Sequence, residues 1–292
     1  MAQPSEQANV PLQNVPLSRA AVLLHPKVPA AQELSAKIIS ILNGLGVETV
    51  CGSVWGSGGI QLALHAVDAC FVLGGDGSLL RAARMAAARS VPIVGINLGK
   101  LGFLSEIEPA DVQERVTMIA AGHYWVEDRI MLAAELVRSG ELAGVFECLN
   151  EVVVARRHLS RVVRVDASID GHYVTTYTAD GVLVATPTGS SAYSLAAGGP
   201  ILHPEVRNLV LTPISAHLSL RSPLVLPETT NIRLTVHTDH EASASFDGQS
   251  DVEMRSGDEI LVRVGAHHAR FLRTQERAYF YHTLVAKLGI AH

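Results

Sequence analysis

Apolar and polar residues alternate in two different rhythms along this chain. In the first 125 residues, short uninterrupted apolar runs have the length and composition of buried strands. These runs are residues 20–25, 70–73 and 92–96, and residues 47–51, which include Glu48 and Thr49, are expected to form a further strand. Longer segments with apolar residues three and four apart predict helices. These helices are 29–45, 78–88 and 109–121. Strands that alternate with helices predict an α/β domain, with an open, mainly parallel sheet covered by helices on both faces.

After about Val126 the apolar residues recur at every second position, which is typical of strands with one buried face. The expected strands are 131–137, 145–154, 162–169, 182–185, 232–236, 242–246 and 259–264. Short turns such as Asp170-Gly171 and Asp247-Gly248 separate them, so we expect a mainly antiparallel β domain. Residues 278–287 carry an apolar face and predict a helix that returns to the first domain.

These patterns divide the 292 residues into four parts. Residues 1–15 are polar, contain two prolines and lack a charged and apolar leader pattern, so we expect a disordered tail. The α/β domain is expected over 16–127 and the β-rich domain over 128–276. The last part, 277–292, contains the returning helix.

Composition and charge limit the partners of the chain. Hydrophobic residues make up 48% of it and charged residues 17%, which is typical of a globular protein with a large core. The net charge of −5 argues against nucleic acid or an anionic membrane surface as a partner. No apolar run reaches the roughly 18–20 residues that span a bilayer. The three cysteines are widely separated, which indicates buried thiols in a reducing cytoplasm.

The segment Leu-Gly-Gly-Asp-Gly-Ser at residues 73–78 is the strongest chemical signal. It places Asp76 in a glycine-lined turn between a buried strand and a helix. We expect the glycines to adopt positive φ and to let the backbone approach a ligand. The helix start that follows suits phosphate. A carboxylate beside phosphate is useful if it orients or deprotonates a hydroxyl that attacks phosphorus. The alternative is that Asp76 only caps the helix.

Two later segments carry further polar groups. Asn150-Glu151 opens a predicted strand, where an amide and a carboxylate could bind a base and a ribose diol, although a polar turn is the simpler alternative. Residues 180–201 run from an apolar strand into the hydroxyl-rich turn Thr186-Pro187-Thr188-Gly189-Ser190-Ser191, followed by a helix that ends at Gly198-Gly199. The serines lack the Gly-x-Ser-x-Gly pattern of a hydrolase nucleophile.

Taken together, these motifs resemble those of the NAD kinase family. The resemblance runs from about Val67 to the C-terminus and includes 73–78, 95–104, Asn150-Glu151 and 180–201 in the family's order. Before Val67 the chain resembles the family only in its strand–helix pattern. The resemblance implies transfer of the terminal phosphoryl group of ATP to the adenosine-ribose 2′-hydroxyl of NAD, giving NADP. It also implies a divalent ion, most simply Mg²⁺, a homodimer or homotetramer, and polyphosphate as a donor in some members.

The resemblance also implies roles for individual residues. Asp76 would be the general base or would orient the hydroxyl, with Asn150 and Glu151 holding adenine and ribose and Asp180 contacting the nicotinamide end. The other positions expected to bind substrate are Gly75, Gly77, Arg81, Arg161, Thr178, Thr188, Ser191, Ala192, Tyr193, Ser194, Leu195, Ala196 and Gln249.

Three of the positions depart from the family pattern. Ser78 and Ser191 stand where threonine is usual or common, and both keep a hydroxyl. Thr178 stands where many bacterial members have arginine or histidine, which leaves the choice between NAD and NADH open.

Two other functions fit parts of the pattern. A diacylglycerol- or sphingosine-type lipid kinase shares the Gly-Gly-Asp-Gly turn, and a dinucleotide-sensing module would keep the binding residues without needing Asp76.

Overall fold

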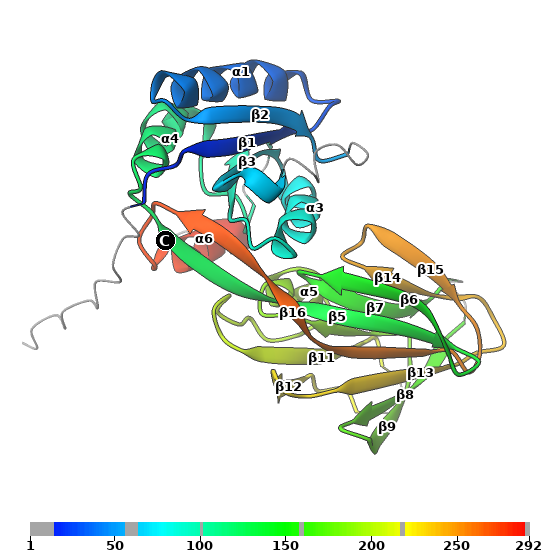
Figure 1. Cartoon of the computed structure of the whole chain (residues 1–292). Helices are drawn as coiled ribbons and strands as arrows, with labels where there is room; N and C mark the ends of the chain where they lie inside the picture. Colours follow the sequence, from blue (N-terminus) through cyan, green and yellow to red (C-terminus); the bar gives the residue numbers. More distant parts are fainter. Residues whose placement is uncertain (1–14, 56–63, 100–101, 158–160, 217–219, 290–292) are drawn as a thin grey trace, which may run out of the picture. The chain divides into compact units, whose positions relative to one another are not determined.

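The computed structural model describes residues 15–55, 64–99, 102–157, 161–216 and 220–289. Most of the tail expected over 1–15 therefore lies outside the described residues. The chain forms two compact units, one made of the residues up to Glu127 with those from Arg270 onward, and the other of Asp128–Ala269 (Figure 1). The pattern of apolar residues predicts the second boundary after residue 276. Residues 270–276 group with the first unit, where Phe271 pairs with Ile93 and Arg273 is buried beside Glu106.

A parallel sheet forms the centre of the first unit. Its strands lie in the order β2-β1-β3-β4, and all three pairings are parallel, as the alternation of strands and helices predicts. The strands are β1 (Arg19–Leu24), β2 (Glu48–Ser53), β3 (Ala69–Gly74) and β4 (Ile93–Asn97). Residues of β3 and β4 are buried throughout, which explains their continuous apolar sequence.

Helices cover both faces of this sheet, as predicted. The helices are α1 (Pro29–Gly44), α3 (Asp76–Ala87), α4 (Val112–Ala120) and α6 (Tyr279–Leu288), with short 3₁₀ turns at Leu64–Ala66 and Pro109–Asp111. One cluster joins α1 and α4 to alternate strand residues such as Val22 and Phe71. Gly95 of β4 faces α3 instead, because a Cβ there would meet the Leu79 side chain. The glycine turn therefore lies at the carboxyl ends of parallel strands, where open α/β sheets bind ligands.

Antiparallel strands dominate the second unit. In one sheet, every pairing in the order β12-β11-β10-β7-β14-β15 is antiparallel. The other sheet of this unit pairs β16 with β13 and β5, β13 with β8, β8 with β9, and β5 with β6. The strands are β5 (Trp125–Arg138), β6 (Glu141–Cys148), β7 (Glu151–Arg156), β8 (Val163–Ile169), β9 (His172–Ala179), β10 (Gly181–Ala185), β11 (Asn208–Ile214), β12 (Leu224–Pro227), β13 (Ile232–His237), β14 (Ala242–Phe246), β15 (Ser250–Met254) and β16 (Glu259–Arg273).

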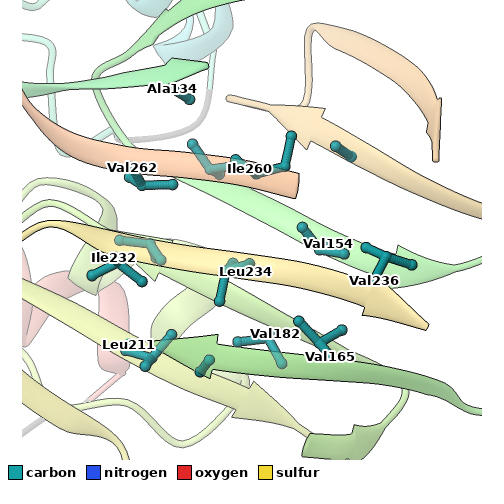
Figure 2. Close-up of a cluster of buried hydrophobic side chains, with 14 of the residues drawn as sticks. Ala134, Val154, Val165, Val182, Leu211, Ile232, Leu234, Val236, Ile260 and Val262 are labelled. Atoms are coloured by element: carbon teal, nitrogen blue, oxygen red, sulfur yellow. The ribbon is translucent and has the colours of Figure 1, made fainter. Parts of the chain in front are cut away.

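The core of the second unit lies between its two sheets. Side chains such as Leu234 and Val262 from one sheet meet Val154, Val182 and Leu211 from the other (Figure 2). All five are at most 1% exposed. Their alternation with polar residues along each strand is the pattern from which the sequence predicted this domain.

Several element boundaries differ from the prediction. The single strand expected over 145–154 is two strands, β6 and β7, separated by Leu149 and Asn150. The chain turns there because Asp247 accepts hydrogen bonds from the backbone N–H groups of Leu149, Asn150 and Glu151. The strands β9, β11, β12 and β15 were not predicted. The helix expected near Ser191 is only a 3₁₀ turn (Gly189–Ser191) and the single turn α5 (Tyr193–Ala196).

Candidate functional site

The Asp76 carboxylate does not cap the helix that it begins. Asp76 is the first residue of α3, Gly75 is the N-cap residue, and the helix start has no side-chain capping bond. Instead, the Asp76 carboxylate accepts hydrogen bonds from the backbone N–H groups of Phe103, at 3.1 Å, and Leu104, at 3.3 Å. Its side chain is 34% exposed, so an external hydroxyl can reach it. The geometry therefore favours a chemical role for Asp76 over a capping role.

The glycines around Asp76 provide space rather than an unusual backbone conformation. The expectation of positive φ is wrong for Gly74, Gly75 and Gly77, none of which is among the positive-φ residues. Gly74 leaves room for Ser78, since a Cβ would lie 2.5 Å from the Ser78 hydroxyl oxygen. Gly75 and Gly77 are exposed with open space where a Cβ would lie. The backbone at the start of α3 is thus open to a ligand.

Gly102 is a fourth glycine of this site, and no sequence motif assigns it a role. A Cβ at Gly102 would overlap the Asp76 carboxylate. The segment after β4 can therefore approach Asp76 closely enough for the next two backbone N–H groups to donate to it. Arg81, one helical turn further along α3, donates from Nε to the Val54 carbonyl at 2.7 Å, and its guanidinium lies 4.7 Å from the centre of the Trp55 ring.

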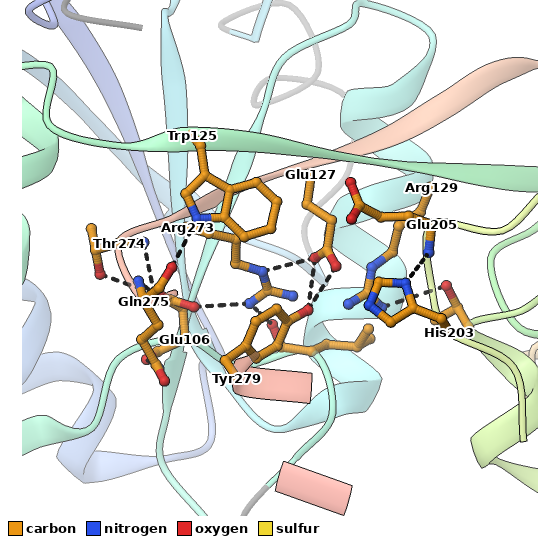
Figure 3. Close-up of polar contacts among 12 residues, drawn as sticks. Glu106, Trp125, Glu127, Arg129, His203, Glu205, Arg273, Thr274, Gln275 and Tyr279 are labelled. Carbon is orange, nitrogen blue, oxygen red and sulfur yellow. Dashed lines mark hydrogen bonds and ion pairs between the residues drawn. The ribbon is translucent and has the colours of Figure 1, made fainter. Parts of the chain in front are cut away.

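A buried ionic cluster supports the segment that holds Asp76 (Figure 3). Arg273 is fully buried and donates to Glu127 at 2.8 Å, to Glu106 at 3.2 Å and to the Leu104 carbonyl at 3.2 Å. Tyr279 donates its hydroxyl to the Glu127 carboxylate, at 2.7 and 2.9 Å from the two oxygens. Burial alone would lower the pKa of Arg273, but Glu127, Tyr279 and Glu106 raise it, so the guanidinium stays charged. Arg273 thereby holds the carbonyl of Leu104, whose N–H donates to Asp76.

A second group of predicted residues gathers at one end of β7 and β10. Glu151 is the first residue of β7 and pairs with Ala185, the last residue of β10. Asp247 lies in the turn between β14 and β15 and is 6% exposed. Its carboxylate accepts the backbone N–H groups of Leu149, Asn150 and Glu151 at 2.9, 2.8 and 3.2 Å. Asp247 therefore fixes the backbone that presents Asn150 and Glu151.

Glu151 has an unusual environment for a carboxylate. It is 7% exposed, and its Oε2 atom has no hydrogen-bond partner among the described residues. Burial, together with the nearby charge of Asp247, raises the pKa of Glu151 to about 8, although a hydrogen bond from the Tyr193 backbone opposes this rise. At neutral pH the side chain is therefore mostly protonated in the free protein. An unpartnered buried oxygen is the property expected of a group that binds a ligand.

The hydroxyl-rich turn packs directly against Asn150. The Thr186 hydroxyl donates to the Leu149 carbonyl at 2.5 Å and accepts the Gly189 N–H at 3.1 Å. A Cβ at Gly189 would overlap the carbonyl of Asn150, so only glycine allows this contact. The fully buried Ser190 donates to the Pro187 carbonyl at 2.6 Å, which makes it a structural hydroxyl rather than a nucleophile.

The remaining predicted residues of this turn differ in exposure. Ser194 is buried and shares a hydrogen bond of 3.2 Å with Thr212, and Thr188 is buried. Ser191, Ala192 and Leu195 are half-buried, and Tyr193 and Ala196 are exposed. Gln249 follows the Asp247-Gly248 turn, and its backbone N–H donates to the Phe246 carbonyl at 3.0 Å. Asn150, Glu151, Thr188 and Gln249 lie at the end of the sheet where β10 ends and β7 begins, whereas Ser194 contacts β11 opposite the middle of β10.

Three predicted residues are not part of this group. Asp180 precedes β10, and the register of β10 with β7 places it at the opposite end from Glu151. At about 3.3 Å per residue, the four steps from Gly181 to Ala185 separate the two ends by about 13 Å. There Asp180 accepts a hydrogen bond of 2.7 Å from Arg156. Thr178 lies near the end of β9, and Arg161 is exposed just before β8.

Two family models together match most of the chain. The family model of the ATP-NAD kinase N-terminal domain matches residues 24–124, and that of the ATP-NAD kinase C-terminal domain matches residues 149–274. The chain belongs to the NAD kinase family. The match from residue 24 extends the resemblance beyond the motifs, which begin near Val67. It also favours this family over the lipid-kinase interpretation of the Gly-Gly-Asp-Gly turn.

Individual relatives cover most of the chain. NAD kinase from Heliobacterium modesticaldum is 40% identical over 281 residues, covering 96% of this chain and 89% of the relative. NAD kinase from Chloroflexus aggregans is 39% identical, covering 93% of this chain and 99% of the relative. Two solved structures, each 26% identical and covering 94% of this chain, have the same fold. The first is yeast NADH kinase complexed with NADH, with a TM-score of 0.85 and 88% of its chain covered. The second is an NAD kinase from Archaeoglobus fulgidus in complex with ATP, with a TM-score of 0.74 and 100% of its chain covered.

Proposed function

We propose that this protein is a phosphotransferase that moves the terminal phosphoryl group of ATP to the adenosine-ribose 2′-hydroxyl of NAD, giving NADP and ADP. The observation that carries the proposal is the Asp76 carboxylate. Two backbone N–H groups hold it at the start of a helix, it is partly open to solvent, and it does not serve as a cap. Its place in the Gly-Gly-Asp-Gly turn of an NAD kinase family member supports the assignment.

In the proposed step, the 2′-hydroxyl donates a hydrogen bond to Asp76, and its oxygen attacks the γ-phosphorus. The new P–O bond forms as the bond to the β-phosphate oxygen breaks, and the hydroxyl proton passes to Asp76. General-base assistance of this kind contributes about 10²–10⁴-fold to a rate. The exposed backbone at Gly75 and Gly77 and the positive end of the α3 dipole would favour the phosphates.

Residues of the second unit supply the binding groups in this proposal. Asn150 would offer an amide to the adenine, and Glu151 would offer the ribose its Oε2 atom, which has no hydrogen-bond partner among the residues that the structure describes. The hydroxyl-rich turn from Thr188 to Ala196 would line the adenosine and phosphates, and Gln249 and Arg161 would contact the dinucleotide. Asp180 would bind the nicotinamide end.

We propose Mg²⁺ as an ion that arrives with the triphosphate. Among the described residues, no group of three or more histidine, cysteine or acidic side chains could hold a metal. Mg²⁺ does not need such a group, because it commonly keeps several waters and binds substrate phosphates with one or two carboxylates. Asp76 is the acidic residue of the first unit that would accompany it, and the ion would neutralise charge on the phosphates.

The cellular location and the oligomeric state of the enzyme also belong to the proposal. No described helix is long and apolar enough to cross a membrane. Cys70 and Cys148 are buried as expected, Cys51 is exposed, and the three cysteines form no disulfide with one another, which fits a reducing cytoplasm. We propose a homodimer or homotetramer, a state that light scattering on the purified protein would measure directly.

The test is NADP formation from NAD, ATP and Mg²⁺, measured with an NADP-specific dehydrogenase. We expect activity in the wild type and a loss of about 10²–10⁴-fold in kcat for Asp76→Asn, with the Kd for NAD unchanged. Asp111→Asn, at an exposed aspartate before α4, is the matched control. No NADP from the wild type, with NAD still bound, would favour the dinucleotide-sensing alternative. Wild-type kcat in Asp76→Asn would refute its role.

A further inference from the structure

We propose that Lys287 is a further catalytic residue of this enzyme, whose ammonium binds an oxygen of the phosphoryl group during its transfer to the hydroxyl held by Asp76. The inference rests on the proposed function but concerns a residue that the sequence motifs do not include. Lys287 lies more than 200 residues after Asp76 in the chain, in the last turn of α6. The fold of the first unit brings the two side chains together.

The contacts of Lys287 place its charge beside the candidate base. Its Nζ atom lies 3.7 Å from Oδ2 of Asp76 and 4.2 Å from the centre of the Phe103 ring. Phe103 is also the residue whose backbone N–H donates to Asp76. The carboxylate and the ring thus hold the ammonium from two sides, through Coulombic attraction and a cation–π contact.

The ammonium keeps its hydrogen-bonding capacity free for a ligand. A lysine ammonium has three N–H donors, and 3.7 Å to Asp76 is longer than a hydrogen bond of 2.7–3.2 Å. Within the described part of the chain, Lys287 makes no hydrogen bond, ion pair or ring contact other than those with Asp76 and Phe103. Its side chain is 25% exposed, so it is ordered by its neighbours and still reachable. An anionic oxygen close to Asp76 would therefore find a cation with unused donors.

The backbone around Lys287 is also well defined. Gly289 ends α6 in the left-handed conformation, with φ of 63°, and its N–H bonds to the Val285 carbonyl. The start of the helix is held by the buried Tyr279, whose hydroxyl binds Glu127. The lysine thus projects from a helix that is anchored by burial at its start and capped at its end. A positioned cation is the group expected to stabilise charge on a transferring phosphoryl group.

The proposed chemistry requires two groups of opposite charge next to one hydroxyl. When the hydroxyl donates to Oδ2 of Asp76, its oxygen lies about 2.8 Å from that atom and therefore no more than about 6.5 Å from the ammonium, which is 3.7 Å from the same atom. The attacked phosphorus carries its non-bridging oxygens into the same space. Lys287 keeps its proton throughout and acts only as a donor, so the proton of the hydroxyl still passes to Asp76.

The experiment compares Lys287→Met, which keeps the length of the side chain, with Lys287→Arg, which keeps the charge. The control is His282→Gln at an exposed position of the same helix. We expect Lys287→Met to lose on the order of 10²-fold in kcat/KM for ATP, as after removal of one donor to a developing oxyanion. Lys287→Arg should retain at least about a tenth of wild-type activity, with His282→Gln unchanged and the Kd for NAD unchanged in every variant.

The results separate this inference from the proposed function. Activity of Lys287→Met within about threefold of wild type would overturn the inference, as would equal losses in Lys287→Met and Lys287→Arg. If the wild type forms no NADP, the proposed function fails, and ATP binding measured by calorimetry decides about Lys287. In that case, weaker binding of ATP by Lys287→Met would support a phosphate-binding role, and equal binding would exclude it.

Discussion

Glu151 gives the sharpest prediction about the pH dependence of this protein. Its pKa is raised from 4.5 to about 8, chiefly by burial and then by the charge of Asp247. The protonated form is therefore favoured in the folded state relative to the unfolded state. The contribution of Glu151 to the free energy of unfolding is therefore greatest below pH 4.5. It decreases as the pH rises from 4.5 through 8, because Glu151 loses its proton at a lower pH in the unfolded chain than in the folded protein.

The size of the effect follows from the two pKa values. Between them, the free energy of unfolding falls by up to about 1.4 kcal/mol per pH unit. The full span from 4.5 to about 8 corresponds to roughly 5 kcal/mol at pH values above both. Glu151→Gln removes this dependence, because glutamine is neutral and has nearly the same shape. Its carbonyl oxygen can still accept the hydrogen bond from the Tyr193 backbone, and its NH₂ group can face the Asp247 carboxylate.

The assay is unfolding by urea at pH 5 and pH 8, for the wild type and for Glu151→Gln. Other titrating groups contribute equally to both proteins, so the difference between the two free energies isolates Glu151. We expect Glu151→Gln to gain about 2–4 kcal/mol relative to the wild type between these pH values. Glu253→Gln, whose side chain is 59% exposed, is the control and should gain nothing comparable. A difference that stays constant from pH 5 to pH 8 would refute the assignment.

Glu151 should also couple proton release to substrate binding. Hydroxyls of a ribose diol donate hydrogen bonds to an ionised carboxylate, which only accepts them. Binding of NAD at pH 7 should therefore release up to about one proton in the wild type and none in Glu151→Gln. Calorimetry in two buffers with different ionisation enthalpies measures this number. Proton uptake, or equal release in both proteins, would contradict a diol bound to Glu151.

Two further substitutions test the groups around Asp76. Gly102→Ala places a methyl group against the Asp76 carboxylate. We therefore expect kcat for NADP formation to fall at least about tenfold, while the free energy of unfolding in urea changes by less than about 2 kcal/mol. A wild-type kcat would contradict the close packing. Tyr279→Phe removes the hydroxyl that bonds to the carboxylate of the buried Glu127. The free energy of unfolding should therefore fall by about 1–3 kcal/mol. Unchanged stability would contradict a stabilising role for this hydrogen bond.

Much of the fold could be predicted because apolar periodicity reports burial directly. The uninterrupted runs became the buried β3 and β4, and the alternating segments became the strands of the second unit. Strand–helix alternation also placed Asp76 at the carboxyl edge of a parallel sheet. The missed strands are less regular in pattern. For example, β9 has exposed residues in three successive positions, His172, Tyr173 and Val174.

The candidate site could be located but not built from sequence. The apolar residues on both sides of Leu149-Asn150 favour one continuous strand, and only the distant Asp247 explains why the chain turns there. Asp247-Gly248 was visible as a turn, which is correct, since both residues have positive φ. The Asp247 carboxylate also accepts three backbone N–H groups of residues 149–151, which no local sequence pattern indicates. The buried Arg273 was similarly invisible, because its partners Glu106 and Glu127 are more than 140 residues away in the chain.

The acidic residues of this protein show why environment, rather than residue type, decides the chemistry. Asp76 and Asp247 both accept backbone N–H groups, but Asp247 is 6% exposed and uses its contacts to hold a turn. The Asp76 carboxylate is open on one side, where a hydroxyl can donate to it. Glu151 is as buried as Asp247, yet one of its oxygens has no hydrogen-bond partner among the described residues, which leaves that oxygen for a ligand. These environments support the three roles proposed for the carboxylates, with Asp76 as acceptor of a proton, Asp247 as structural anchor and Glu151 as binding group.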